Sequence, residues 1–420
     1  MTVSKERTIV SVVNPICCGI DVHKESITAC ILTSDRKGKE LRIIEEFLTF
    51  TDDLCRLREW LFEHECPIVA MESTGVYWHP VHNIIEGYVT VVLVNARDIK
   101  NVPGRKTDIK DSEWLAGLLR HGLLRSSFIP PQEVRMWRNL TRMRRKYVDS
   151  LSGYKKRVQK LFESANIKID SVVSDLFGVT GRNLMSLLTS GRTAITMRDI
   201  EESVRGSLKH KKQELYRSIK GFFTDHHRFL LQILLSTIAS LENTIVLLDQ
   251  RIREHMCDCG DLIERMKEVP GISDISARDI IAEIGTTLET FPNEAALASW
   301  SGLCPGNNES AGKRKSGKNH TWKNHVKSIM TEVAWAAART KNTYYHEKFH
   351  RLKTRRGHKK AVVAIAHKIM KCLYHIIKNG ASYSELGVDY LDKKSKQAKV
   401  HRLHKQAESL GFKLIPVPVK

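Results

Sequence analysis

Two short apolar runs in the first hundred residues each carry one carboxylate. Asp21 lies inside the run at residues 16–22, and Glu72 ends the run at residues 67–72. Apolar runs of this length predict buried strands. Because a carboxylate is costly to bury without a partner, we expect both strands to bring these side chains to a polar site.

Two further carboxylates, Asp108 and Asp111, are three residues apart and would project from one face of a helix. Carboxylates in a dry site repel one another unless cations lie between them, and Mg²⁺ prefers oxygen ligands. Two Mg²⁺ ions about 3.5–4 Å apart are a common arrangement for phosphodiester chemistry. The four residues together predict a magnesium site that acts on nucleic acid. Taken singly they would also suit caps or salt bridges, and Asp98 and Glu113 are nearby substitutes with poorer spacing.

Positive charge is concentrated in two windows of the sequence. The 420-residue chain has a formal net charge of +21; residues 100–160 carry +11 and residues 311–360 carry +13. The remaining 309 residues are close to neutral at −3. Concentrated positive charge is expected for a polyphosphate partner, although a solvated lysine-rich surface would give the same composition.

The nine cysteines are scattered, odd in number and without a paired C-x-x-C, which predicts free thiols in a reducing cytoplasm. The N-terminus has no apolar targeting segment, and we expect no apolar run of membrane-spanning length. We therefore expect a soluble cytoplasmic protein with no membrane partner. The length suits two or three domains.

The first 128 residues predict an alternating α/β domain. Strands are expected at 16–22, 26–33, 41–50, 67–72 and 88–94, and helices at 51–65, 77–86 and 108–121. Three strands, a helix, a strand, a helix, a strand and a helix is the ribonuclease H-like order. In that order the acidic residues converge at the ends of neighbouring central strands.

The middle of the chain is expected to be helical, with a long basic helix over 133–162 and a weaker helical and loop region over 166–222. An apolar seam at coiled-coil spacing follows, made of Leu230, Leu234, Ile238, Leu241, Ile245, Leu248 and Ile252. Two long helices could pair as a hairpin within the chain, with a second subunit, or in both ways.

A second module starts near Ile263. Its segment Val269-Pro-Gly-Ile272 resembles a helix–hairpin–helix, whose turn can present backbone N–H groups to a phosphate. A Gly-, Asn- and Lys-rich loop is expected over 300–318, helices over 322–340 and 359–378, and from Lys393 a charged tail that can stay disordered until it binds. The predicted domains are 1–128 (catalytic), 129–260 (basic helix and coiled coil), 261–380 (C-terminal) and 381–420 (tail).

Basic side chains near these features are candidate contacts to nucleic acid. Lys24 could touch a phosphate or be a turn residue. The basic helix interleaves Trp137 and Tyr147 with arginines, which suits phosphate contacts along a helical nucleic acid or a solvated helix face. The candidates are Lys24, Lys100, Arg105, Lys106, Arg138, Arg142, Arg144, Arg145, Lys146, Lys313, Arg314, Lys315, Arg355, Arg356, Lys359 and Lys360.

Ser310 lies in the basic loop beside Lys313. A serine is a poor nucleophile unless a neighbour takes its proton or lowers its pKa, and the sequence shows no obvious His–Asp pair for it. From the residues alone Ser310 is best interpreted as an ordinary loop hydroxyl, and Ser301 and Ser316 are equal candidates.

Several motifs occur in a fixed order over residues 16–380. They are Gly19-Ile-Asp-Val-His-Lys24, Met71-Glu-Ser-Thr-Gly75, Lys106-Thr-Asp-Ile-Lys-Asp-Ser112, Val269-Pro-Gly-Ile272, Gly302-Leu-Cys-Pro305, Ser310-Ala-Gly312, Ala334-Trp-Ala-Ala-Ala-Arg-Thr340 and Arg356-Gly-His-Lys-Lys-Ala361. This set resembles the insertion sequence 110 transposases, also called bridge recombinases, which are relatives of the pilin-gene inverting recombinases. The chain departs from the family at Lys323-Asn324, where a Gly-Asn pair is common.

The resemblance implies a RuvC-like domain in which Asp21, Glu72, Asp108 and Asp111 form a D-E-D-D tetrad that holds Mg²⁺. It also implies that Ser310 is a catalytic serine that forms a transient phosphoserine link to DNA. In the family the two halves form a composite site, usually across subunits of a tetramer assembled by the coiled coil. A structured guide RNA encoded by the element pairs with the target and donor DNA.

Three other functions fit parts of the sequence. A metal-dependent junction nuclease would use the same tetrad without a covalent step, and Ser310 would be idle. A nucleic-acid-binding regulator with a degenerate nuclease fold is disfavoured by the intact tetrad. Sugar kinases and actin-like ATPases share the α/β core, but the chain lacks their Gly-rich phosphate loops.

Overall fold

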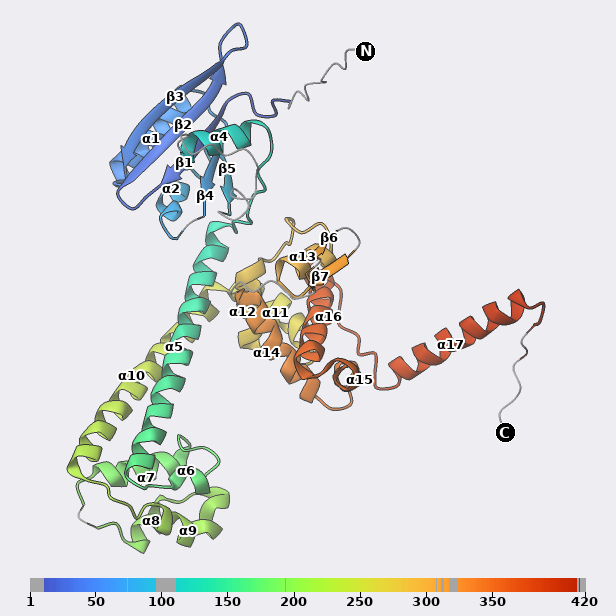
Figure 1. Ribbon diagram of the computed structural model, residues 1–420. Coiled ribbons are helices and arrows are strands. Elements are labelled where there is room, and N and C mark those ends of the chain that lie inside the picture. Colours follow the sequence, from blue (N-terminus) through green and yellow to red (C-terminus); the bar gives the residue numbers. More distant parts are fainter. Residues whose placement is uncertain are drawn as a thin grey trace. The chain divides into compact units, whose positions relative to one another are not determined.

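The computed structural model describes residues 11–73, 75–95, 111–192, 194–306, 308–310, 313–316, 324–413 and 415, and it describes side chains outside 307–323. Internal contacts divide the chain into two units, Met1–Ile129 and Pro130–Lys420. Each unit is described by itself (Figure 1).

The first unit is built on a five-stranded mixed sheet. Its elements are β1 (Cys17–Val22), β2 (Ser26–Ser34), β3 (Glu40–Leu48), α1 (Thr51–Glu63), β4 (Ile68–Glu72), α2 (Trp78–Ile85), β5 (Thr90–Val94) and α4 (Asp111–Arg120). The strand order is β3-β2-β1-β4-β5, with antiparallel pairing on the β2 side of β1 and parallel pairing through β4 to β5. The predicted ribonuclease H-like order of strands and helices is therefore confirmed.

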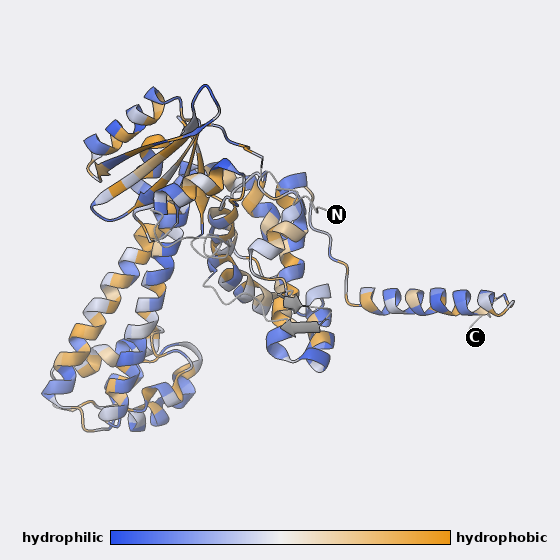
Figure 2. Cartoon of the chain, turned by 45° about the horizontal axis from the view of Figure 1, so that its top comes forward, coloured by the Kyte–Doolittle hydropathy of each residue, from blue (hydrophilic) through white to orange (hydrophobic). Residues whose placement is uncertain are grey.

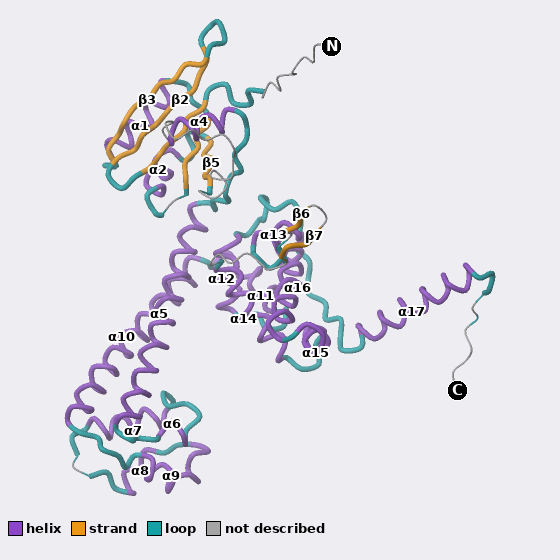
Figure 3. The backbone as a smooth tube through the Cα atoms, in the orientation of Figure 1, coloured by secondary structure: helices purple, strands orange, loops and turns teal. Residues whose placement is uncertain are grey.

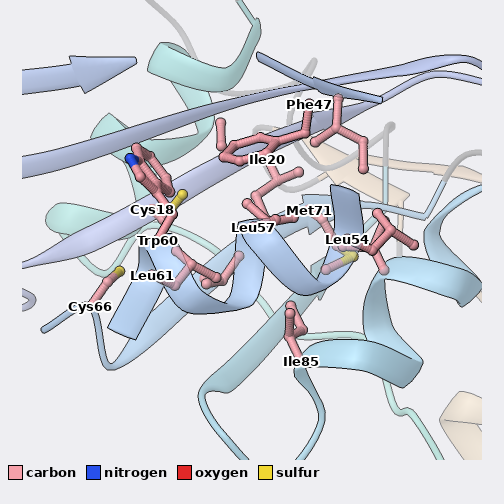
Figure 4. Close-up of a cluster of buried hydrophobic side chains, with 14 of the residues drawn as sticks. Cys18, Ile20, Phe47, Leu54, Leu57, Trp60, Leu61, Cys66, Met71 and Ile85 are labelled. Atoms are coloured by element: carbon pink, nitrogen blue, oxygen red, sulfur yellow. The ribbon is translucent and has the colours of Figure 1, made fainter. Parts of the chain in front are cut away.

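Helices cover both faces of this sheet. On one face α1 and α2 enclose the main core, where Ile20, Leu57 and Trp60 pack together (Figure 4). On the other face α4 packs through Ala116 and Leu119 onto Cys17 of β1. Because side chains of a strand alternate between faces, a central strand buried on both sides must be almost wholly apolar. Much of the sheet is accordingly coloured as hydrophobic in Figure 2, although the edge strand β3 contains several charged residues.

The second unit begins with two long helices that pack side by side, α5 (Gln132–Ser164) and α10 (Asp225–His255). The predicted apolar seam lies on α10, and Ile238 and Ile252 of that seam are buried. The hairpin within one chain is therefore present. Contrary to expectation, α10 is by length and composition apolar enough to cross a membrane. One such helix is weak evidence for a membrane segment, and its seam packs here against protein.

Short helices connect α5 to α10. They are α6 (Ile169–Val172), α7 (Val179–Thr189), α8 (Met197–Ser203), η1 (Gly206–Lys211) and α9 (Lys212–Ser218). Their apolar side chains form one core with Phe162 at the end of α5 and Leu231 at the start of α10. The region predicted as weakly helical is thus a small packed subdomain at the tip of the hairpin.

The regular elements that the structure describes in the rest of this unit are helices and one short hairpin (Figure 3). Its elements are η2 (Cys257–Cys259), α11 (Gly260–Lys267), α12 (Asp274–Ile284), α13 (Glu294–Trp300), β6 (Asn308–Ser310), β7 (Lys313–Ser316), α14 (His325–Arg339), α15 (Tyr344–Arg356), α16 (His358–Asn379) and α17 (Tyr390–Ser409). The helices α11 and α12 flank the Val269-Pro-Gly-Ile272 turn, as a helix–hairpin–helix requires.

This region differs from the sequence analysis at three places. The loop predicted around Ser310 contains the two paired strands β6 and β7. The helix α15 was not predicted, because its sequence is dominated by His, Lys and Arg rather than by an apolar period. The tail after Lys393 forms the helix α17.

Candidate active site

The sheet places Asp21 and Glu72 next to each other. In the parallel pairing of β1 with β4, Ile20 is opposite Met71, so the next residue along each strand is Asp21 or Glu72. Side chains alternate along a strand, so both carboxylates project from the face that α4 covers. They lie at the carboxyl ends of two neighbouring parallel strands, where open sheets commonly bind ligands.

The helix α4 brings Asp111 to the same edge. It packs so closely on β1 that a Cβ atom at Gly19 would lie 2.1 Å from the carbonyl oxygen of Ser112 and 2.4 Å from the backbone nitrogen of Ala116. Only glycine allows this approach. Gly19 and Asp21 lie on the same face of β1, and Asp111 directly precedes Ser112. The close contact at Gly19 therefore positions Asp111 beside the strand-end carboxylates.

Two of the other predicted acids act electrostatically on Asp21. Burial raises the pKa of the Asp21 carboxyl, and the negative charges of Asp111 and Glu72 raise it further. His23 acts in the opposite direction: its Nε2 atom lies 3.1 Å from Oδ2 of Asp21. The negative potential that these neighbours create at Asp21 is what a bound cation would relieve.

The residues fit a divalent cation by their chemistry. Asp21, Glu72 and Asp111 would supply oxygen ligands from three different elements at one edge of the sheet. Among the described residues, however, no group of three or more His, Cys, Asp or Glu side chains is close enough to share one metal ion. Like charges without a cation between them favour separation, so binding would draw these carboxylates together.

Some predicted residues lie outside the described ranges, namely Asp98, Lys100, Arg105, Lys106 and Asp108. The substitute Glu113 does not join the acidic set, since its Oε2 atom pairs with Nη1 of Arg42 at 3.0 Å. Lys24 lies in the turn between β1 and β2, with an exposed side chain and a backbone carbonyl that accepts the Thr49 hydroxyl.

Ser310 is the last residue of β6, and its backbone pairs with Lys313 of β7. The side chains of Ser310, Lys313, Arg314, Lys315 and Ser316 are outside the described set. Of the alternative serines, Ser301 is fully buried, and its hydroxyl donates to the Leu297 carbonyl at 2.7 Å. A serine buried and hydrogen-bonded in this way is poorly placed to attack a phosphate.

Most of the α5 arginines that were predicted to contact nucleic acid instead bind acidic or carbonyl groups of the protein itself. Arg142 makes a bidentate pair with Glu283 at 2.7 and 2.8 Å, and Arg138 donates to the Glu283 carbonyl at 2.5 Å. Arg144 pairs with Asp249 on α10, and Arg145 pairs with Glu332 on α14. The exposed candidates of the second unit are Lys146, Arg355, Arg356, Lys359 and Lys360.

One of the two aromatic residues interleaved with these arginines belongs to the core. Trp137 is buried, and its indole nitrogen donates to the His255 carbonyl at 3.0 Å. Although the chain departs from the family at Lys323-Asn324, Asn324 still caps the N-terminus of α14. The Asn324 side chain accepts the Lys327 amide and donates to the Trp300 carbonyl at 3.0 Å, which fixes the start of α14 against the end of α13.

Two residues near the site were not proposed from sequence. His23 pairs with Asp21, and it could have been predicted as a partner because it lies only two residues further along the chain. Gly19 permits the packing of α4, and no local pattern distinguishes a glycine of this kind from others.

Family comparisons agree with this arrangement. The model for DEDD transposases of the IS110 type, described as "Transposase", matches residues 18–167, and the model described as "Transposase IS116/IS110/IS902 family" matches residues 263–351. The protein is thus a DNA transposase or recombinase, an enzyme of a class that generally uses divalent metals. More particularly, the chain belongs to the IS110 family of transposases.

Among solved structures, the chain is similar to one entitled "Thermus thermophilus RuvC structure". The identity is 17%, the match covers 28% of this chain and 85% of that chain, and the TM-score is 0.19. No curated protein matches the chain.

Proposed function

We propose that this transposase cuts and rejoins DNA at element ends and target sites through two sets of residues. Asp21, Glu72, Asp108 and Asp111 hold Mg²⁺, and Ser310 is the nucleophile. The observation that carries the proposal is the convergence of Asp21, Glu72 and Asp111 at one edge of the sheet. Burial raises the pKa of Asp21, and the charges of Asp111 and Glu72 raise it further. Asp108 precedes Asp111 by three residues in sequence.

In the proposed reaction the Ser310 Oγ atom attacks the scissile phosphorus. An O–P bond forms to serine, the bond to one sugar oxygen breaks, and that oxygen takes up a proton. A hydroxyl end of the exchanged strand then attacks the phosphoserine and releases the serine, so the number of phosphodiester bonds is conserved. Magnesium bound at the tetrad would stabilise charge on the phosphate and favour loss of the serine proton.

The remaining assignments complete the proposal. Residues 1–128 form the RuvC-like catalytic domain, 129–260 the coiled-coil and oligomerisation region, 261–380 the domain that supplies the serine, and 381–420 a tail. A structured guide RNA selects the DNA by base pairing, and the protein acts as a dimer or tetramer in the cytoplasm of a bacterium or archaeon, at the nucleoid. Two windows of positive charge support simultaneous binding of RNA and DNA.

A covalent-adduct assay tests the serine step. Purified protein, RNA transcribed from the flanks of the element, labelled junction DNA and Mg²⁺ are combined and resolved on a denaturing gel. We expect a DNA-linked protein band for the wild type that disappears in both Ser310→Ala and Asp21→Ala. The matched control is Ser316→Ala in the same hairpin, which should retain the band.

The second candidate function is a metal-dependent junction nuclease of the RuvC type. It is favoured by the same acidic cluster, which needs no serine to cut DNA. It predicts cleavage without any protein–DNA band and no effect of Ser310→Ala. That result would exclude the covalent step while leaving the acidic site intact.

A further inference from the structure

Cations gather around α15, which contacts both α16 and α17. This basic cluster consists of Lys348, Arg351 and Arg355 on α15, Lys368 on α16 and Lys394 on α17. Lys348, Arg351 and Arg355 follow at intervals of three and four residues, so they share one face of α15. All but Lys348, which is half-buried, are exposed.

The cluster has more positive charge than its surroundings balance. Burial lowers the pKa of Lys348, and the charges of Lys368, Lys394, Arg351 and Arg355 lower it further. Arg351 is partly compensated, since its Nη2 atom lies 2.6 Å from Oδ2 of Asp392. Like charges held this close are stabilised by a bound anion.

The basic cluster lies at the N-terminal end of α17, which we call its root. Several contacts hold this root on α15. The Tyr390 ring packs edge-to-face on Tyr344, with centroids 5.6 Å apart. In the preceding linker, the Glu385 carboxylate accepts the Tyr344 amide at 2.8 Å and the Tyr383 hydroxyl at 2.7 Å. With the Arg351–Asp392 pair, these contacts set the direction in which α17 leaves α15.

Beyond its root, α17 has no packing partner in its own chain. None of its residues, all of which the structure describes, is buried, and hydrophilic residues occur on every turn (Figure 2). An isolated helix of about 20 polar residues is marginal in water, so such a helix gains most of its stability from a partner.

The sequence of α17 indicates which partner. Five of its cations recur at every third residue, and we call them the α17 ladder: Lys393, Lys396, Lys399, Arg402 and Lys405. On a helix of 3.6 residues per turn, a three-residue period shifts by about 60° at each step, so the ladder winds around most of the helix over about 18 Å. Asp392 and Glu408 are the only acidic residues of α17, so little negative charge balances the ladder.

Cations on opposite flanks of one helix suit a groove with phosphates on both walls. The major groove of B-form DNA admits an α-helix, whereas that of A-form RNA is too narrow for side chains to read. A membrane surface would require a continuous apolar side, which Lys396 and Lys399 interrupt. A second copy of α17 is disfavoured as the partner because the same cations on both helices would repel one another.

We infer that α17 and the basic cluster at its root form an arm that binds the phosphate backbone of duplex DNA. The inference rests on DNA as the substrate, which the family membership establishes. It concerns DNA beyond the reacting strands, and neither the acidic tetrad nor Ser310 takes part.

The test is binding of full-length protein to a labelled 30-base-pair duplex of arbitrary sequence, without Mg²⁺ and over a range of salt concentrations. The ladder variant replaces all five cations with Gln, which keeps helix propensity. Each lost phosphate contact should reduce the slope of log affinity against log salt by about 0.9, so we expect a reduction of about 3–4. At about 100 mM salt, affinity should fall at least tenfold.

A control variant removes the same charge elsewhere, with Arg36, Lys37, Lys39, Lys209 and Arg217 replaced by Gln. Its affinity should stay within about threefold of wild type, and both variants should keep the wild-type melting temperature. For a duplex RNA of the same sequence, the affinity of the ladder variant should be less than about threefold below that of the wild type. An equal loss for RNA and DNA, or an equal loss for the control variant, would overturn the inference. Because the assay contains no catalytic step, its failure would leave the serine and tetrad proposal untouched.

Discussion

At the scale of single residues, Gly19 controls the geometry of the acidic site. A methyl group there would meet the backbone of Ser112 and Ala116 at about 2 Å and push α4 away from β1. Gly19→Ala should therefore cost about 1–3 kcal/mol of stability and move Asp111 away from Asp21. We expect calorimetric titration with Mn²⁺ to show at least a tenfold loss of affinity, together with a loss of DNA cleavage.

The matched control is Gly117→Ala on the same helix. Nothing lies within 4 Å of a Cβ atom at that position, so the change should stabilise α4 by up to about 1 kcal/mol and leave Mn²⁺ affinity unchanged. Wild-type metal affinity in Gly19→Ala would show that α4 does not position a ligand.

A second prediction at this scale concerns the pH dependence of stability that Asp279 causes. Burial raises the pKa of its carboxyl from 3.8 to about 6; Arg144 and Arg145 lower it, and Glu332 and Glu283 raise it. Because the folded pKa lies above the unfolded one, the stability contributed by this group is fully present below about pH 3.8 and is lost as the pH rises through 6.

Asp279→Asn should consequently raise the free energy of unfolding above pH 6, by up to about 2–3 kcal/mol, and have no effect near pH 4. Thermal denaturation of both proteins between pH 4 and pH 8 measures this difference. The exposed Asp261→Asn should change stability by less than about 0.5 kcal/mol throughout. A variant less stable than wild type at pH 8 would mean that the two arginines outweigh the cost of burial.

At the scale of elements, a buried ion pair joins the long helix α5 to α12. The Glu283 side chain is buried between Arg138 and Arg142, with an exposed fraction of 3% for the residue. Glu283→Gln leaves both guanidinium groups without their carboxylate and should cost about 3–5 kcal/mol locally. Hydrogen exchange of the α12 amides should accelerate by at least a hundredfold.

The control for this change is Glu264→Gln. Glu264 pairs with Lys267 on the exposed side of α11, where an ion pair contributes at most about 0.5 kcal/mol. Its exchange rates should remain at wild-type values. Unchanged protection of α12 in Glu283→Gln would show that apolar packing, rather than the ion pair, holds α12 on α5.

The ion pair between Glu283 and the arginines of α5 shows what can and cannot be predicted about elements from sequence. Strands and helices of the first unit were predictable because each has a clear apolar period. The arginines of α5 were predicted as nucleic-acid contacts because a basic run shows charge but not its partner, and Glu283 is more than a hundred residues away. The helix α15 was not predicted, since its apolar residues are few.

At the scale of the whole molecule, the placement of the two strand carboxylates was predictable, whereas nothing local marks the serine. Asp21 and Glu72 follow from strand order, because neighbouring parallel strands bring their ends together. The placement of Asp111 depends on how α4 packs at Gly19. Ser310 depends on the family resemblance, since nothing in its local chemistry distinguishes it from Ser316. Packing that depends on distant segments, as at Gly19, has no local pattern from which it could be read.

The last prediction concerns assembly. The helix α10 packs its seam on α5 but exposes further apolar residues, with Phe229 60%, Ile233 47% and Leu247 66% exposed. Apolar residues left along one long helix are typical of a surface that a second subunit covers. Replacing all three with Gln should shift the mass measured by light scattering toward the monomer without lowering the melting temperature.

The matched control replaces Phe62, Val179 and Phe222, which are at least as exposed but scattered, with Gln. Its mass should equal that of the wild type, because isolated apolar residues are normal on a protein surface. A monomeric α10 variant that still binds DNA but no longer forms the covalent adduct would show that the serine step needs the assembled protein. An unchanged mass would mean that α10 serves only the hairpin within one chain, and that any oligomer forms through another surface.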